Sequence, residues 1–185
     1  MTDELKKVTV KGRLLGGGIW KARENPNDAD KMEYSACVVL EEGQEKKIEA
    51  LRDAALKKEF GNTSLKGKED HTLRYGDDEE YEHSFEKHFI NPKCREDRPH
   101  AMKVRRNGTV KDTTMEEDLI YPGCNVAVSV SAYAYQGGKK FKAGVTLNLR
   151  ALMFLSHNER LSDTVNDSEF DGFESDEEFE DNEDW

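Results

Sequence analysis

A strict alternation of apolar and polar residues near the end of the chain constrains its fold more than any other feature. The even positions of residues 124–135 are apolar: Cys124, Val126, Val128, Val130, Ala132 and Ala134. The odd positions are mostly polar or amphipathic: Asn125, Ala127, Ser129, Ser131, Tyr133 and Tyr135. A period of two is that of a β-strand with one buried face.

The alternation resumes after a turn at Gln136-Gly137-Gly138. The return segment puts one set of residues on the apolar face: Phe141, Val145, Leu147 and Leu149. Its other face carries Lys140, Lys142, Thr146, Asn148 and Arg150. Two alternating segments joined by a glycine turn predict an antiparallel β-hairpin packed against a core.

Further strands are predicted upstream of this hairpin. Residues 8–15 alternate, and the three glycines at 16–18 that follow favour a sharp strand bend over a phosphate-binding loop. Residues 33–40 are apolar on both faces and predict a central strand, and residues 85–90 predict another strand. Residues 102–112 predict a hairpin around Asn107-Gly108.

One helix interrupts the strand patterns. Between Gln44 and Phe60 the apolar residues Ile48, Leu51 and Ala55 follow helical spacing, and Gly61 closes the segment. The sequence therefore predicts a mainly β protein, an antiparallel barrel of five or six strands with one inserted helix.

The last 24 residues differ sharply in charge from the rest. Positions 162–185 hold 12 acidic residues and no Lys or Arg, within a chain of 28 basic and 39 acidic residues. Positions 1–161 therefore hold 28 basic and 27 acidic residues, a net charge of +1. We expect one folded domain over 1–161 and a disordered acidic tail over 162–185.

The non-core faces of the predicted strands bring together basic and flat side chains. The proposed DNA-binding set is Lys11, Arg13, Trp20, Lys21, Arg23, Lys103, Arg105, Arg106, Lys111, Tyr133, Tyr135, Lys139, Lys140 and Lys142. Single-stranded nucleic acid is bound by this mixture, because cations pair with phosphates and aromatic rings stack on unpaired bases. Phosphate contacts do not distinguish strand state, so binding of double-stranded DNA stays open.

The tail adds aromatic rings to its negative charge, at Phe170, Phe173, Phe179 and Trp185. A segment with both properties imitates a single strand, so we expect it to compete for the basic groove and to bind partner proteins. Two alternatives remain open. Each exposed Tyr or Lys taken singly is also ordinary β-sheet surface, and the chain could be an acidic-tailed chaperone for basic proteins that does not bind DNA.

The chain resembles the bacteriophage single-stranded DNA-binding proteins, which have one OB-fold and an acidic C-terminal tail ending in an aromatic residue. The resemblance rests on residues 119–124 (Leu-Ile-Tyr-Pro-Gly-Cys), on the hairpin from 126 to 149, on residues 157–161 and on the tail with Trp185. It implies an OB-fold, sequence-independent DNA binding in replication and recombination, no catalysis, and a tail that recruits replication or recombination proteins. It also implies the cytoplasm of an infected bacterium, and it leaves the oligomeric state open.

Other chemistries find weak support. His83, His88, Cys94 and His100 lack the tight paired spacing of zinc sites. An EF-hand-like match at 167–178 lacks flanking amphipathic helices, and the acidic cluster at 116–118 suits a solvated turn better than a nuclease magnesium site. No segment is apolar enough to span a membrane, and three widely spaced cysteines suit a reducing compartment. We therefore expect no metal, no cofactor, no enzyme activity and no membrane association.

Overall fold

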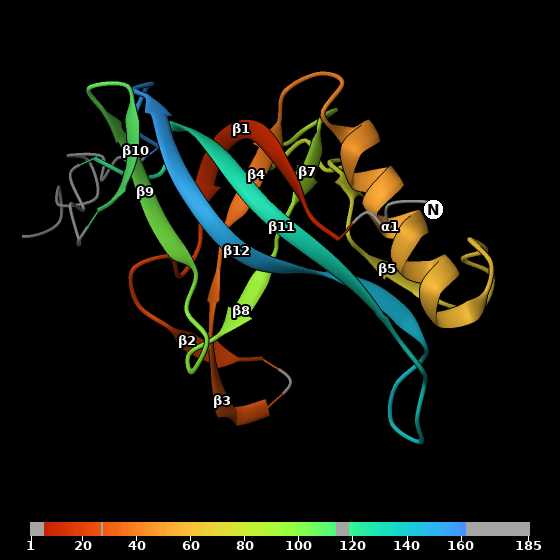
Figure 1. Ribbon diagram of the computed structural model, residues 1–185. Helices are drawn as coiled ribbons and strands as arrows, with labels where there is room; N and C mark the ends of the chain where they lie inside the picture. Colours follow the sequence, from red (N-terminus) through yellow and green to blue (C-terminus); the bar gives the residue numbers. More distant parts are fainter. Residues whose placement is uncertain (1–5, 27, 114–118, 162–185) are drawn as a thin grey trace, which may run out of the picture.

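The computed structural model describes residues 6–26, 28–113 and 119–161 (Figure 1). Most of the described chain is β-strand, and one helix, α1 (Glu45–Phe60), lies between the fourth and fifth strands. The strands are β1 (Val8–Gly16), β2 (Arg23–Asn25), β3 (Asp28–Ser35), β4 (Cys37–Leu40), β5 (Glu69–His71), β6 (Arg74–Tyr75), β7 (His88–Ile90), β8 (Lys93–Arg95), β9 (Ala101–Arg106), β10 (Thr109–Asp112), β11 (Asn125–Tyr135) and β12 (Gly144–Ser156). The predicted mainly β class with one inserted helix is confirmed.

The long β11–β12 hairpin is the centre of one curled sheet. The main path of strands is β2-β3-β8-β12-β11-β1-β4-β7-β6, while β5 and β9 also pair with β12, and β10 pairs with β9. Figure 1 shows the hairpin crossing the molecule as a strongly twisted ribbon whose tip projects past α1. The hairpin predicted from the alternation is therefore present, and it organises the rest of the sheet.

The core lies between the apolar faces of β1 and β11 and the inner face of α1. The even positions Val126, Val128 and Val130 are fully buried, as the period of two requires, and so are Ile48 and Leu51 on the helix to within 1 %. Each such side chain contributes about 1.5–3 kcal/mol relative to exposure. The same alternation leaves the odd positions of β11 on the outer face of the sheet.

The helix and the second hairpin end as their sequences predict. Gly61 adopts the left-handed conformation, and its N–H donates to the Lys57 carbonyl at 2.9 Å. Asn107 and Gly108 both have positive φ, as the tight turn between β9 and β10 demands. Turn and cap chemistry therefore located these two boundaries correctly.

The predicted central strand over residues 33–40 is instead two strands. The strand is interrupted at Ala36, which is fully buried and donates its N–H to the Pro92 carbonyl. Before this residue β3 pairs with β2 and β8, and after it β4 pairs with β1 and β7. An apolar run records burial but not a change of pairing partner, so the sequence pattern did not reveal the break.

The sheet also has more strands than the five or six expected, and it is not purely antiparallel. Strands β2, β5, β6, β7 and β8 have only two or three residues, too few to show a period. Three strands pair in parallel with β12: the short strands β5 and β8, and β9 from the second hairpin. The expected strand over 85–90 is accordingly reduced to β7.

Phe141 does not belong to the core, contrary to the expectation from alternation. Strand β12 begins at Gly144, so residues 136–143 form a loop and Phe141 is 59 % exposed. The apolar and polar alternation therefore continues in the sequence before the point where the strand starts.

No helix within the described residues is long and apolar enough to cross a membrane.

Candidate nucleic-acid interface

A groove of about 910 Å³ opens beside the tip of the β11–β12 hairpin. One wall is the outer face of β11 and β12, and the other walls come from β2, β3, β5, β6 and β8 together with the residues that flank them. The groove therefore joins segments that are far apart in the sequence, and its chemistry depends on the fold.

Three aromatic rings form the hairpin wall of the groove. Tyr133 and Tyr135 stand two residues apart on β11 with ring centroids 6.3 Å apart, and Tyr135 lies 6.1 Å from Phe141 on the following loop. Tyr133 is 54 % exposed and Phe141 59 %. Their faces are thus available to flat ligands, and the spacing makes a short row of stacking surfaces.

The glycine that opens the return strand leaves room for the Tyr135 side chain. A Cβ atom on Gly144 would lie 2.6 Å from the Tyr135 hydroxyl oxygen and 2.7 Å from the Glu69 carbonyl oxygen. Burial, with the nearby charge of Glu69, raises the pKa of the Tyr135 hydroxyl. The ring is therefore a neutral and well-positioned platform at neutral pH.

The positive charge of the groove comes from strands other than the hairpin. Five basic or titratable side chains line it: His71, Arg74, Lys93, Arg95 and Arg98. They lie on β5, β6 and β8 or just after β8, and both β5 and β8 pair with β12 on the side away from β11. Cations in one groove with aromatic rings suit a ligand with a charged backbone and flat bases.

Two acidic groups inside the groove partly neutralise these cations. Glu33 accepts from Lys93 Nζ at 2.6 Å and from Asn25 Nδ2 at 3.0 Å, while Glu69 Oε2 lies 3.2 Å from His71 Nε2. The Glu33 side chain is only 16 % exposed. Lys93 is therefore paired when the groove holds no ligand.

Several predicted residues lie in or beside the groove. Tyr133 and Tyr135 line it. Lys139, Lys140 and Lys142 are exposed on the loop that carries Phe141, next to the aromatic row. Arg23 on β2 lies opposite Glu33 in the β2–β3 strand register, at the border of the groove. The exposed Lys21 lies two residues before Arg23. The structure thus brings together about half of the predicted set.

Other predicted residues are engaged elsewhere. Arg13 donates to the carbonyls of Gly123 and Glu159 at 3.0 and 2.9 Å. Trp20 packs against the core and donates its indole N–H to the Ile120 carbonyl at 3.2 Å, so its surroundings are those of a structural residue. Lys11 is exposed on β1, outside the groove lining.

The cations of the β9–β10 hairpin form a separate surface. Lys103 pairs with Asp112, Arg105 donates to the Gly108 carbonyl at 2.8 Å, and Arg106 and Lys111 are exposed. Strand β9 pairs with the second half of β12, whereas the groove borders the first half. The predicted set therefore divides into two patches along one strand.

Sequence reasoning missed Arg74, Lys93, Arg95, Arg98 and Phe141. A usable signal existed at residues 93–95, where two cations flank a buried cysteine in a period of two. Arg74 and Arg98 lie in or next to segments too short for any periodic signal.

The histidine and cysteine residues considered for zinc come together only as a pair. Cys94 Sγ lies 3.7 Å from His100 Nδ1, and burial raises the pKa of the thiol and lowers the pKa of the imidazole. Both groups are therefore neutral near pH 7. Within residues 6–26, 28–113 and 119–161, no three His, Cys, Asp or Glu side chains are grouped to hold a metal ion.

The predicted tail residues Phe170, Phe173, Phe179 and Trp185, the EF-hand-like segment and the acidic cluster at 116–118 lie outside the described residues. The described residues that precede the tail are hydrogen-bonded to the rest of the domain. The Tyr121 hydroxyl contacts His157 Nδ1 and the backbone of Asn158, and the Leu161 N–H donates to the Pro122 carbonyl. Residues 157–161 are thereby held against residues 121–123.

Comparison with known proteins gives one family and several similar structures. Residues 5–183 match the family model described as Enterobacter phage Enc34, ssDNA-binding protein. The solved structure of the single-stranded DNA-binding protein from bacteriophage Enc34 has a TM-score of 0.63 and 15% identity, over 91% of this chain and 90% of that one. The same protein in complex with ssDNA also gives 0.63 and 15%, over 85% and 90%.

A second phage protein shares the fold at a lower score. The gp2.5 single-stranded DNA-binding protein encoded by bacteriophage T7 has a TM-score of 0.51 and 15% identity, over 87% of this chain and 97% of that one. No curated protein sequence gave a significant match. At these identities the structural likeness establishes the fold, and the family match covers nearly the whole chain.

Proposed function

The chain belongs to the Enterobacter phage Enc34 ssDNA-binding protein family, and from this premise we propose that it binds single-stranded DNA in the groove beside the β11–β12 hairpin. The observation that carries this proposal is the groove's composition. A row of three aromatic rings and five basic or titratable side chains line one groove of about 910 Å³.

The groove suggests binding without sequence preference. Bases stack on Tyr133, Tyr135 and Phe141, and any base presents a suitable face to them. The cations of the groove neutralise phosphates, so affinity falls steeply as salt rises. Stacking and charge together favour an unpaired strand, because its bases are free to stack on the aromatic side chains.

The acidic tail has a part in this proposal. Its 12 acidic residues and interleaved aromatics resemble the ligand, so it competes for the groove when DNA is absent and binds replication or recombination proteins when DNA displaces it. The protein acts by binding and protecting strands in phage replication, in the cytoplasm of the infected bacterium, and it catalyses no reaction.

Alanine substitution of the aromatic row tests the proposal. We expect Tyr133→Ala, Tyr135→Ala and Phe141→Ala each to weaken binding of a fluorescein-labelled oligo(dT) by about 5- to 150-fold, since each stacked base contributes about 1–3 kcal/mol. Fluorescence anisotropy at two salt concentrations measures this change, with a duplex of the same length beside it.

Tyr81→Ala is the matched control, because Tyr81 is 67 % exposed on the acidic connection before β7 and does not line the groove. Its affinity should equal that of the unaltered protein. Groove variants that bind like this control would contradict the site. A protein that binds a basic protein such as a histone but no oligonucleotide would instead be a chaperone.

A further inference from the structure

Strand β12 connects the groove to the basic β9–β10 hairpin. Its first half contributes Thr146 and Asn148 to the groove lining, and its second half pairs with β9 from Ala151 to Met153. Met153 lies five positions after Asn148 on the strand, a distance of about 16 Å at about 3.3 Å per residue. The two basic patches are therefore neighbours along one strand.

A β-bulge presents Arg150 midway between them. Val130 pairs with Leu149 and Ser129 pairs with Ala151, so Arg150 is the extra residue on β12. In such a bulge two residues oppose one on the partner strand. Leu149 is buried, whereas Arg150 is exposed on the outer face with Ser129.

Arg150 differs from three of the cations nearby, Lys93, Arg95 and Lys103, in having no partner among the described residues. Lys93, Arg95 and Lys103 are paired with Glu33, Asp97 and Asp112 respectively. Within the part of the chain that the structure describes, no hydrogen bond or ion pair engages the Arg150 guanidinium. This side chain is therefore ready to accept an anion without first losing a bond.

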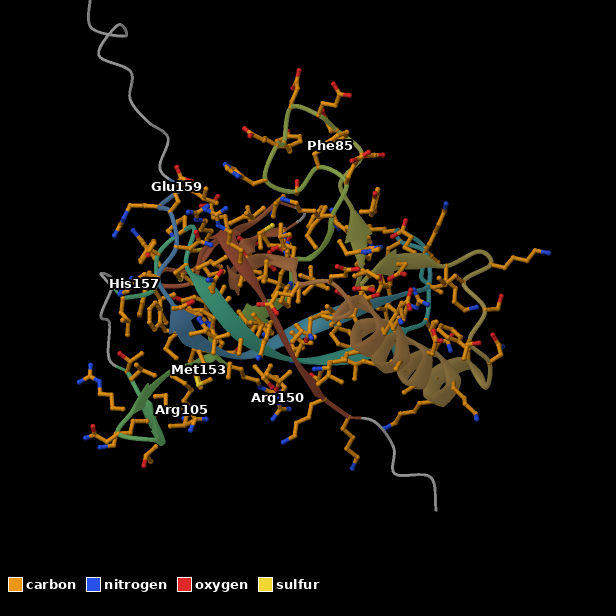
Figure 2. All side chains as sticks on the ribbon, turned by 90° about the horizontal axis from the view of Figure 1, so that it is seen from above. Phe85, Arg105, Arg150, Met153, His157 and Glu159 are labelled. Carbon is orange, nitrogen blue, oxygen red and sulfur yellow. The ribbon has the colours of Figure 1, made fainter. Side chains whose placement is uncertain are left out.

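The surface around Arg150 is open and continues to the hairpin. Its neighbours on the outer face are small: Ser129, Ser131 and Ala151, each half-buried. Figure 2 shows Arg150, Met153 and Arg105 along one edge of the molecule, across from Phe85. Met153 pairs with Lys103, so the outer face of β12 passes directly onto the cations of β9.

We propose that a bound single strand leaves the groove over Arg150 and continues onto the β9–β10 hairpin, with Arg150 contacting a phosphate. This inference rests on the proposed function and adds the strand's path to it. The small side chains let the sugar-phosphate backbone approach, and the hairpin cations Lys103, Arg105, Arg106 and Lys111 receive its far end. The site then consists of a stacking part and an electrostatic part.

An oligonucleotide length series tests this path. With oligo(dT) from about 6 to about 24 nucleotides, since one OB-fold covers about 4–16, the unaltered protein should gain affinity as the strand grows beyond the groove. We expect Arg150→Ala to bind the shortest bound oligonucleotide as before and to lose most of that gain. Its salt slope on long strands should fall by about 0.7, the value for one phosphate contact on a single strand.

Lys57→Ala is the matched control, since Lys57 is an exposed cation on α1 and lies outside both patches. It removes the same charge and should leave the length gain and the slope unchanged. An Arg150→Ala protein with the full gain would overturn the path, as would equal losses in both variants. A change in oligomeric state instead of binding would assign this face to a second copy. Failure of the unaltered protein to bind any oligonucleotide would refute the proposed function itself.

Discussion

Glu33 occupies a position in the groove where a phosphate would be expected. It is largely buried and accepts hydrogen bonds from Lys93 and Asn25. A phosphate that pairs with Lys93 has to displace this carboxylate. In the proposed complex, Glu33 therefore competes with the DNA phosphate for Lys93 and limits DNA affinity there. Asp97, which pairs with Arg95, has the same effect at that cation.

We expect Glu33→Gln to tighten oligo(dT) binding by about two- to fivefold, which corresponds to ~0.5–1 kcal/mol for a partly exposed ion pair. The gain should shrink at high salt, because salt screens the charge that was removed. Anisotropy titrations at two salt concentrations measure it, with Glu49→Gln on the exposed side of α1 as the control of equal charge. Weaker binding would mean that Glu33 instead holds Lys93 in its productive position.

At the scale of elements, Gly12 explains how β1 can cross so close to β4. A Cβ atom there would lie 2.2 Å from the Val39 carbonyl oxygen and 2.7 Å from Val38 Cγ1. We expect Gly12→Ala to lower the free energy of unfolding by about 1–3 kcal/mol, the usual cost of overpacking, as measured by urea denaturation.

Gly61→Ala provides the comparison, because it strains only the backbone. Gly61 has φ near +73° and nothing within 4 Å of an added Cβ, so the cost there is about 1 kcal/mol. If Gly12→Ala proved no more costly than Gly61→Ala, the close approach of β1 and β4 would not constrain the sheet. Neither variant should change DNA affinity under conditions where the protein is folded.

The elements also show what the sequence could and could not predict. The hairpin at 124–149, α1 and the turn at Asn107-Gly108 were predictable, because each extends over enough residues to show a period or has specific turn chemistry. The break at Ala36 and the short strands β5 to β8 were not, because their positions depend on pairing partners elsewhere in the chain. For this reason two of the three aromatic residues of the groove were predicted, Tyr133 and Tyr135, whereas the cations that line it were missed.

At the scale of the whole molecule, the charge is divided unevenly. Positions 1–161 have a net charge of +1 and the complete chain −11, so the tail, like DNA, is an anion, and the proposed function has the two compete for the same cations. The contacts of residues 157–161 with residues 121–123 determine where the tail leaves the domain. A 24-residue segment extends at most about 80 Å from that point, which is far enough to reach its own groove.

We expect deletion of residues 162–185 to tighten binding of single-stranded DNA, most clearly at low salt where the competing charges are least screened. Parallel titrations of the full-length and shortened proteins measure the effect. A full-length variant with the tail acids changed to Asn and Gln separates charge from length and should bind like the shortened protein. Equal or weaker binding after deletion would rule out competition by the tail.

The pairing of β1 with β11 also sets how much of the chain must be synthesised before the central part of the sheet can form. Val8 pairs with Val130, about 120 residues later in the chain. At about 5–20 residues per second, a ribosome needs about 6–24 s to deliver that partner, and until then β4 is the one of the two strand partners of β1 that has been synthesised. Tyr133 and Tyr135 lie on the same late strand, so a chain that ends before β11 lacks both the central strand of the sheet and the aromatic pair of the groove.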